Sequence, residues 1–205
     1  DNNTVGSVGI PLVHNNVGIF DPETNQELQT GKVGEIRIYG DSMMNCYENN
    51  DSENERVTDI NNGQKWFKTG DLGSISEKSE LYVTGRIKRI FVCGVDKVYQ
   101  ESMEELICTL PYIQKCAVVA IPDKELRNVP KVHVVLKNEY QTEKYKKLAK
   151  YDIEKLVSEK ISKNVVPHYY EFQNDLIYTP NGKVDFKKIQ ENDVKNMSIS
   201  TEKIR

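Results

Sequence analysis

Four short segments of the sequence place polar side chains where they could bind a ligand, and they span residues 69–73, 85–89, 94–98 and 179–185. In the first, Asp71 lies between Gly70 and Gly73 and is predicted to occupy a turn. A carboxylate held in this way can accept paired hydrogen bonds from a diol such as a ribose. An ordinary Asx turn explains the same triplet equally well.

The second and third segments mark the middle of the chain. Residues 85–89 contain three cations, Arg86, Lys88 and Arg89, which could bind phosphate or simply be solvated. Residues 94–98 predict a turn that leads into a helix. The acidic residues that follow this turn are explained by the positive end of a helix.

The fourth segment, residues 179–185, is the most specific of the four as a candidate ligand-binding motif. Its Pro180-Asn181-Gly182 sequence predicts a tight turn with Lys183 at its tip. A flexible ammonium in that position can reach a phosphate or a carboxylate that is brought to it. A single turn of this kind is usually only part of a hairpin. The order of the four segments along the chain therefore has to show whether this turn belongs to a functional site.

The elements that position these residues are predicted to be β strands in the first part of the chain. Residues 35–39 alternate apolar and polar side chains, as in a strand with one buried face. Residues 48–63 are strongly polar and predict an exposed loop with at most one helical turn. Short strands at close spacing predict a small antiparallel barrel or sandwich. The other predicted strands include 17–20, 66–67 and 81–83.

Beyond Arg86 the pattern changes to an α/β one. Apolar residues recur at helical spacing over 103–110 and 149–161, and continuous apolar runs at 116–121 and 132–136 predict buried strands. The order helix, strand, strand, helix predicts a small open α/β layer. Residues after about 190 are polar, and we expect them to be frayed and flexible.

The composition excludes several classes of function. The net charge of -3 and the pI of about 5.8 argue against a general nucleic-acid binder. No apolar run approaches the roughly 20 residues of a membrane span, and the amino end lacks the features of a secretory signal. We therefore expect a cytoplasmic protein or a piece of one. The four cysteines show no metal-ligand spacing, so they are interpreted as reduced thiols and no metal site is predicted.

The order of these motifs resembles that of the adenylate-forming, or AMP-binding, superfamily. That superfamily includes acyl-CoA synthetases, adenylation domains of peptide synthetases, carrier-protein ligases and firefly luciferase. The resemblance covers about residues 6–189, and several motifs in one order are far more specific than any single motif. The segments that carry it are Gly31-Lys32-Val33-Gly34-Glu35-Ile36, Trp66-Phe67-Lys68-Thr69-Gly70-Asp71-Leu72-Gly73, Leu81-Tyr82-Val83-Thr84-Gly85-Arg86-Ile87-Lys88, Lys97-Val98 with Glu104, Ala117-Val118-Val119 and Asn181-Gly182-Lys183-Val184-Asp185.

The resemblance implies an α+β fold in two parts. Residues 1–86 would form the small antiparallel β-barrel subdomain that ends a large amino-terminal domain. Residues 87–205 would form the carboxyl-terminal α/β lid domain. The phosphate loop and the acyl pocket of the family are expected upstream, so the chain is expected to be a fragment that is inactive alone.

The activity implied is that of an ATP-dependent acid–thiol ligase. A fatty acid or another small carboxylic acid attacks the α-phosphate of ATP, giving an acyl-adenylate and pyrophosphate, and the thiol of CoA then displaces AMP. Mg²⁺ is implied with ATP, with its protein ligand outside this chain. Two alternatives remain open: an adenylation domain or ligase that loads a carrier-protein pantetheine, and a non-catalytic domain that binds a nucleotide or a protein partner.

The resemblance also assigns roles to individual residues. Asp71 matches the acid that binds the ribose hydroxyls, and Arg86 matches the arginine that contacts the ribose and phosphate. Lys88 matches the hinge about which the lid rotates between the two half-reactions. Lys183 matches the lysine that binds the substrate carboxylate and α-phosphate oxygens during adenylation.

The loop that would line the pantetheine tunnel departs from the family pattern. Val95, Gln100 and Ser102 stand where the family usually has Gly, Pro and Glu. Gly94 could supply the glycine with a shift of one residue. Otherwise Val95 would crowd the path of the thiol.

Overall fold

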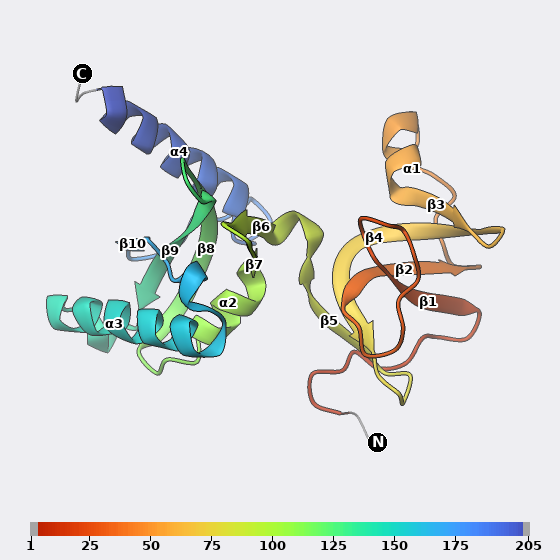
Figure 1. The fold of residues 1–205 in the computed structure, drawn as a ribbon, viewed down its shortest axis with the longest axis horizontal. Coiled ribbons are helices and arrows are strands. Elements are labelled where there is room, and N and C mark those ends of the chain that lie inside the picture. The colour runs from red at the N-terminus through yellow and green to blue at the C-terminus, as the bar shows by residue number, and fades with distance from the viewer. Residues whose placement is uncertain (1–3, 203–205) are drawn as a thin grey trace. The chain divides into compact units, whose positions relative to one another are not determined.

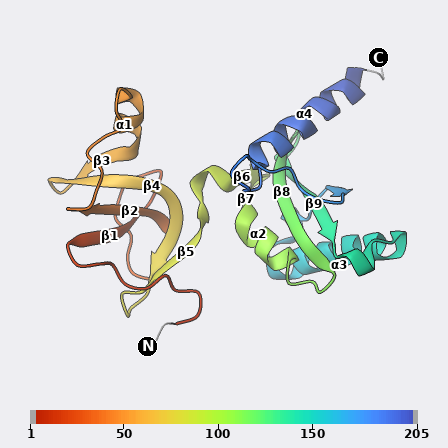
Figure 2. The same cartoon turned by 180° about the vertical axis from the view of Figure 1, so that it is seen from behind.

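The computed structural model describes residues 4–202 and divides the chain into two compact units, Asp1–Lys88 and Arg89–Arg205, each with its own sheet. Figures 1 and 2 show the order of the elements from two sides. No helix in the described part of the chain is long and apolar enough to cross a membrane. That the first unit ends a larger amino-terminal domain and that the second is a lid both stay predictions.

The first unit is an antiparallel sheet organised around one long strand. Strand β4 pairs with β2, β3 and β5, and β1 pairs with β2. The strands are β1 (Asn15–Phe20), β2 (Gly34–Gly40), β3 (Thr58–Asn61), β4 (Gln64–Ile75) and β5 (Leu81–Arg86). The predicted α+β class is confirmed, but the pairing path among the described strands is open, so this sheet is not a closed barrel.

Strand β2 differs from the simple alternation predicted for residues 35–39. Glu35 and Arg37 are buried together with Ile36, because the two charged side chains form an ion pair beneath the surface. Arg37 also pairs with Asp59 of β3 and lies over the ring of Phe20, 4.7 Å from its centroid. The polar face of this strand is therefore part of the interior.

The polar segment 48–63 also contains more structure than predicted. It forms helix α1 (Asp51–Val57) followed directly by β3. Asn50 caps the helix by accepting a hydrogen bond from the amide of Glu53, and Val57 is buried at the other end. Asn54 also bonds the backbone of Tyr47 through its side chain, so a polar helix is held here by hydrogen bonds as well as by one buried residue.

The second unit has a mixed sheet covered by helices. In this sheet β8 and β9 form a long hairpin, and β10 lies parallel to β9. The strands are β6 (Ile90–Cys93), β7 (Asp96–Tyr99), β8 (Ile113–Asp123), β9 (Arg127–Leu136) and β10 (Tyr169–Phe172). The helices are α2 (Gln100–Ile107), α3 (Glu143–Lys160) and α4 (Phe186–Glu202), with short 3-10 turns at Ile87–Arg89, Asn138–Tyr140 and Lys163–Val165.

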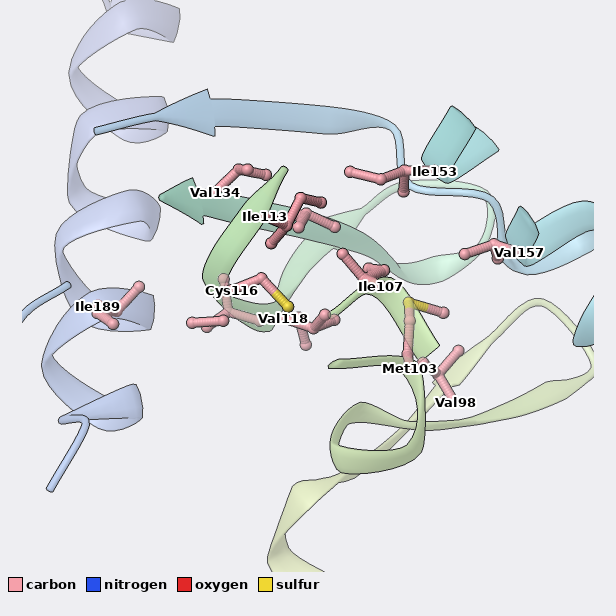
Figure 3. Close-up of a cluster of buried hydrophobic side chains, with 14 of the residues drawn as sticks. Val98, Met103, Ile107, Ile113, Cys116, Val118, Val134, Ile153, Val157 and Ile189 are labelled. Carbon is pink, nitrogen blue, oxygen red and sulfur yellow. The ribbon is translucent and has the colours of Figure 1, made fainter. Parts of the chain in front are cut away.

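The core of this unit lies between the sheet and its helices (Figure 3). Met103 and Ile107 of α2 and Ile153 of α3 are fully buried, as the helical spacing predicted. The β8 and β9 strands bury their side chains almost continuously, which is why they read as unbroken apolar runs. The predicted pattern of helix, strand, strand, helix is present in this unit.

The prediction of a frayed segment after about residue 190 differs from the structure. Helix α4 continues to Glu202, and Ile189 and Asp193 on it are 2% and 4% exposed. Asp193 is buried because it pairs with Lys131 and His133 of β9, at 2.6 and 2.7 Å. Asp193 is polar and so does not contribute to the apolar periodicity from which a packed helix face is predicted. The sequence therefore does not indicate that this helix packs on the sheet.

Candidate functional site

Asp71 and Arg86 are brought together by the pairing of β4 with β5. The two residues are register partners on neighbouring strands. Arg86 Nε lies 2.9 Å from Asp71 Oδ1, and the side chains remain 66% and 30% exposed. The strand register thus presents an accessible carboxylate and an accessible guanidinium as one unit.

The residues on either side of Asp71 hold the backbone conformation of this segment. Thr69 Oγ1 donates to the carbonyl of Ile36 at 2.6 Å and accepts from the amide of Asp71 at 3.0 Å. Gly70 has a φ of 72°, which favours glycine, and a Cβ on Gly73 would come within 2.2 Å of the Tyr82 carbonyl oxygen. Asp71 thus lies within strand β4 and not on the turn predicted for it, at a point where the strand is irregular because Gly70 has a positive φ and the pairing with β5 shifts between Leu72 and Gly73. Its carboxylate is paired with Arg86 and remains partly exposed.

A cavity of about 320 Å³ in the first unit adjoins this irregular part of β4, with Thr69, Gly70 and Arg86 in its wall. Its cationic lining residues are Arg37, Arg56, Lys68, Arg86 and Lys88. Two carboxylates, Glu35 and Glu53, also line the cavity, and Lys68 and Lys88 form no ion pair within residues 4–202. The five cations outnumber the two carboxylates, so the lining is positive on balance. An anionic ligand such as a polyphosphate fits this charge.

Lys88 lies in the short 3-10 turn Ile87–Arg89, at the end of the first unit. Its side chain is exposed. The position follows the last residue of β5 by two residues, where the chain leaves the sheet. A short turn of this kind can absorb a backbone rotation without breaking a strand pairing.

Gly94 and Val95 form the two-residue turn between β6 and β7. Gly94 has a φ of 61° and its amide donates to the Leu126 carbonyl at 2.8 Å, whereas Val95 is 91% exposed. A positive φ at the first turn position is the pattern of a type II′ hairpin turn. The glycine that this loop needs is therefore at position 94, and the Val95 side chain points away from the protein interior.

Lys183 lies on a turn whose other residues have structural roles. Gly182 has a φ of 75°, and Thr179 closes the turn through backbone and hydroxyl hydrogen bonds to Lys183. Asp185 accepts from the amide of Lys188 at 3.0 Å and so caps helix α4. The Lys183 side chain is exposed and its ammonium has no partner among the described residues. The fold gives this ammonium no structural task.

The contacts in the described part of the chain join Asp71 to Arg86 but connect no other pair of the predicted site residues. Asp71, Arg86 and Lys88 belong to the first unit, whereas Gly94, Val95 and Lys183 belong to the second. The sequence motifs thus identify two groups of residues, one in each unit.

An ion-pair network at Arg89 was missed at the sequence level. Arg89 donates to both carboxylate oxygens of Glu104 on α2, at 2.6 and 3.0 Å, and its guanidinium lies 3.5 Å from the centroid of the Phe186 ring. Glu104 in turn accepts from the amide of Val118 at 2.6 Å, and burial raises the pKa of this carboxyl group. The network fixes the start of α4, three residues after Lys183. In the sequence Arg89 is one of three cations in residues 85–89, and no local pattern indicates that it pairs with Glu104.

One cluster of metal-ligand residues occurs in the described part of the chain: His133, Glu171 and Asp193. The Lys131 ammonium lies 2.7 Å from Glu171 and 2.6 Å from Asp193. The Lys131 ammonium occupies the space between the two carboxylates, and the third group is a histidine nitrogen, so the cluster does not fit Mg²⁺, which takes octahedral oxygen ligands and keeps several waters.

Comparison with known proteins places these residues in a family. The family model described as the AMP-binding enzyme C-terminal domain matches residues 102–183. The putative acyl-CoA ligase YdaB of Bacillus subtilis is 35% identical over 178 residues, which cover 87% of this chain and 33% of that protein. A long-chain-fatty-acid–CoA ligase of the same species is 30% identical over 200 residues, covering 96% of this chain and 33% of the ligase.

The solved structure of an ATP-bound RpMatB-BxBclM chimera superposes with a TM-score of 0.84 at 25% identity, over 95% of this chain and 37% of the chimera. The chain spans about a third of the length of the curated relatives named above. The motif order, the fold of both units and these matches agree, and the chain belongs to the adenylate-forming, AMP-binding enzyme superfamily and includes its carboxyl-terminal domain.

Proposed function

We propose that the protein containing this chain is an ATP-dependent acid–CoA ligase. A carboxylate attacks the α-phosphate of ATP to form an acyl-adenylate with release of pyrophosphate, and the thiol of CoA then displaces AMP. The ligase names of the relatives support this reaction class. The acid substrate is selected by residues outside this chain.

Lys183 carries the proposal. Its turn is fixed by Gly182, Thr179 and Asp185, yet its own ammonium is exposed and unpaired within residues 4–202. An uncommitted cation on a rigid turn suits a transition state in which negative charge develops on the carboxylate and phosphate oxygens. We assign Lys183 to the adenylation step.

Asp71 and Arg86 are assigned to the nucleotide. The Asp71 carboxylate accepts hydrogen bonds from the ribose hydroxyls. Arg86 orients that carboxylate and also contacts the ribose and phosphate. The cationic cavity beside them, with Lys68 and Lys88, supplies positive charge to phosphate oxygens. Mg²⁺ bound with ATP would neutralise further phosphate charge, and we assign its protein ligand to a part of the enzyme outside this chain.

The two units are assigned the roles of a platform and a lid. In this proposal residues 1–86 end the large domain, residues 87–205 form the lid, and rotation at Lys88 exchanges adenylation for thiol transfer. The β6–β7 turn then lines the thiol path. Gly94 supports this role because it has the positive φ that the tight turn requires.

The proposal is tested with Lys183→Ala in the full-length enzyme. Pyrophosphate release is measured over a panel of carboxylic acids, and thioester formation is measured separately from a supplied acyl-adenylate and CoA. We expect adenylation to fall by about 10² to 10³, as for loss of one transition-state charge contact. Thioester formation should be nearly unchanged.

Lys187→Ala is the matched control, because Lys187 is also exposed and lies in the first turn of α4, four residues after Lys183. It should leave both half-reactions intact. Equal losses in the two half-reactions of Lys183→Ala would contradict the assigned role. A folded wild-type enzyme that releases no pyrophosphate with any acid would favour the non-catalytic alternative, and transfer to a carrier-protein pantetheine but not to CoA would identify the other acceptor.

A further inference from the structure

The sulfur atoms of Cys108 and Cys116 lie 3.6 Å apart where helix α2 ends and strand β8 begins. Seven residues separate the two cysteines in sequence. Both side chains belong to the second unit, so the pair is complete within one folded body. The proposed ligase reaction uses neither thiol.

The two thiols differ in access. Cys108 is exposed and Cys116 is buried. Figure 3 shows Cys116 beside Val118 among the core side chains. A reagent in solution therefore reaches the Cys108 sulfur first, and the Cys116 sulfur is shielded from it.

The two thiols also differ in reactivity. A hydrogen bond from Cys116 lowers the pKa of Cys108 to about 7, and the same interaction together with burial raises the pKa of Cys116. A thiolate is the form that attacks oxidants, and a thiol whose pKa is close to the ambient pH combines thiolate fraction with nucleophilicity. Cys108 is thus suited to be the attacking thiol, and Cys116 is suited to be the resolving thiol.

Both cysteines lie where regular secondary structure is interrupted. A disulfide needs an S–S distance of about 2.05 Å, so the sulfur atoms must approach from 3.6 Å. Cys108 is the C-cap residue of α2, with no helical turn after it. The β8–β9 ladder shifts its register between Ile113 and Lys115, immediately before Cys116, so the start of this strand is also irregular.

We propose that Cys108 and Cys116 form a peroxide-sensitive site that closes to an intramolecular disulfide. The Cys108 thiolate attacks a hydroperoxide, the O–O bond breaks, and Cys108 becomes a sulfenic acid with loss of hydroxide or alkoxide. The Cys116 sulfur then displaces the sulfenic oxygen as water, and its thiol proton leaves with that water. Two electrons pass from the thiols to the peroxide, and a thiol reductant restores the pair.

Closure has a local structural consequence. The Cys116 thiol has one hydrogen, which can be donated to Cys108 or to the backbone carbonyl of Glu104, 3.5 Å from its sulfur, and a disulfide removes this donor. It also ties the end of α2 covalently to the start of β8. Glu104 is the residue that holds Arg89 beside Phe186, so the oxidised bond forms one turn away from that network.

The test uses peptide mapping of the full-length protein after treatment with hydrogen peroxide and alkylation of the remaining thiols. Trypsin cleaves after Lys115 and therefore separates Cys108, in peptide 98–115, from Cys116, in peptide 116–124. We expect these two peptides to be recovered as one cross-linked species that dithiothreitol separates. Failure to recover it while Cys108 accumulates as sulfinic acid would overturn the proposal.

Single variants assign the order of events. In Cys116→Ala, Cys108 has no resolving thiol and should proceed to sulfinic acid, whereas in Cys108→Ser the buried Cys116 should remain reduced. Cys46→Ser, which removes an exposed cysteine of the first unit, should leave the cross-link unchanged. Oxidation of Cys116 at the wild-type rate in Cys108→Ser, or a cross-link that depends on Cys46, would contradict the assigned roles.

Discussion

Arg37 and Arg86 each pair with a carboxylate on the same sheet, but they differ in burial. Arg37 is 1% exposed, whereas the Arg86 side chain is 66% exposed. A buried ion pair loses a great deal when one partner is removed, because the other charge stays in the interior without compensation. An exposed pair is screened by water and adds little to stability.

Arg37→Met should strongly destabilise the first unit. It leaves the Glu35 and Asp59 carboxylates without the guanidinium that lies 2.8 and 2.6 Å from them. We expect a loss of about 3–5 kcal/mol in the free energy of unfolding, measured by urea denaturation. A loss as small as that of an exposed pair would mean that water reaches these carboxylates.

Asp71→Asn should change function without changing stability. Because its pair with Arg86 is largely exposed, the free energy of unfolding should change by less than about 1 kcal/mol. In the full-length enzyme the KM for ATP should rise, since an amide replaces the proposed acceptor of the ribose hydroxyls. An unchanged KM for ATP with unchanged stability would remove Asp71 from the nucleotide site.

The reactivity of Cys108 should depend on pH around neutrality. Its lowered pKa of about 7 means that the thiolate fraction, and hence the rate of alkylation by iodoacetamide, rises through that pH. Cys116→Ala removes the hydrogen bond that lowers the pKa, so the midpoint should move upward towards the ordinary value of about 8.5. Peptide-resolved alkylation rates measure both midpoints.

At the level of elements, helix α4 is held by charge as well as by apolar contact. Asp193 pairs with Lys131 and His133 from β9, and Ile189 packs into the core. The Nδ1 atom of His133 is buried and has no hydrogen-bond partner among the described residues. The helix that begins directly after the Lys183 turn is thus anchored to the sheet one to two turns further on.

Asp193→Ala should loosen this anchor. It leaves the buried His133 without its partner and Lys131 with Glu171 alone, so we expect a loss of about 1–3 kcal/mol. Amide hydrogen exchange should accelerate across residues 186–197 more than in α3. Glu191→Gln, which alters an exposed pair on the same helix, is the control and should have no such effect.

At the level of the whole molecule, each unit has its own core. The buried apolar residues of the first unit include Phe20, Trp66 and Leu72, and the larger core of the second unit draws only on residues beyond 90. Separate cores are the condition for separate folding. The second unit also buries many more apolar side chains, which favours its stability.

Residues 89–205 should therefore fold alone. We expect a single cooperative thermal transition, followed by near-ultraviolet circular dichroism, with tyrosine side chains in fixed surroundings. Residues 1–205 should show a further thermal transition, that of the first unit, which residues 89–205 lack. The Arg37→Met change should lower the temperature of that transition. A broad transition with no near-ultraviolet signal would show that the second unit depends on residues 1–88.

The sequence alone was sufficient for the fold class, for most strands and core helices, and for the family. The elements depend on apolar periodicity, which is local in the chain, and the family depends on the order of short motifs along it. The sequence also indicated the turn that carries Lys183, since turns are short-range structures. The turn predicted at Asp71 was wrong, because Asp71 lies within the long strand β4, whose length depends on pairing with β2 and β5.

Only the tertiary structure decided which polar residues are buried and which side chains meet. The Arg37 network, the Asp193 anchor, the Arg89–Glu104 pair and the contact of Cys108 with Cys116 all join residues from different elements. Each of these residues looks like a solvated or isolated side chain when it is read locally. Strand register and helix packing bring the partners together, and burial then makes the charge or the thiol chemically distinct.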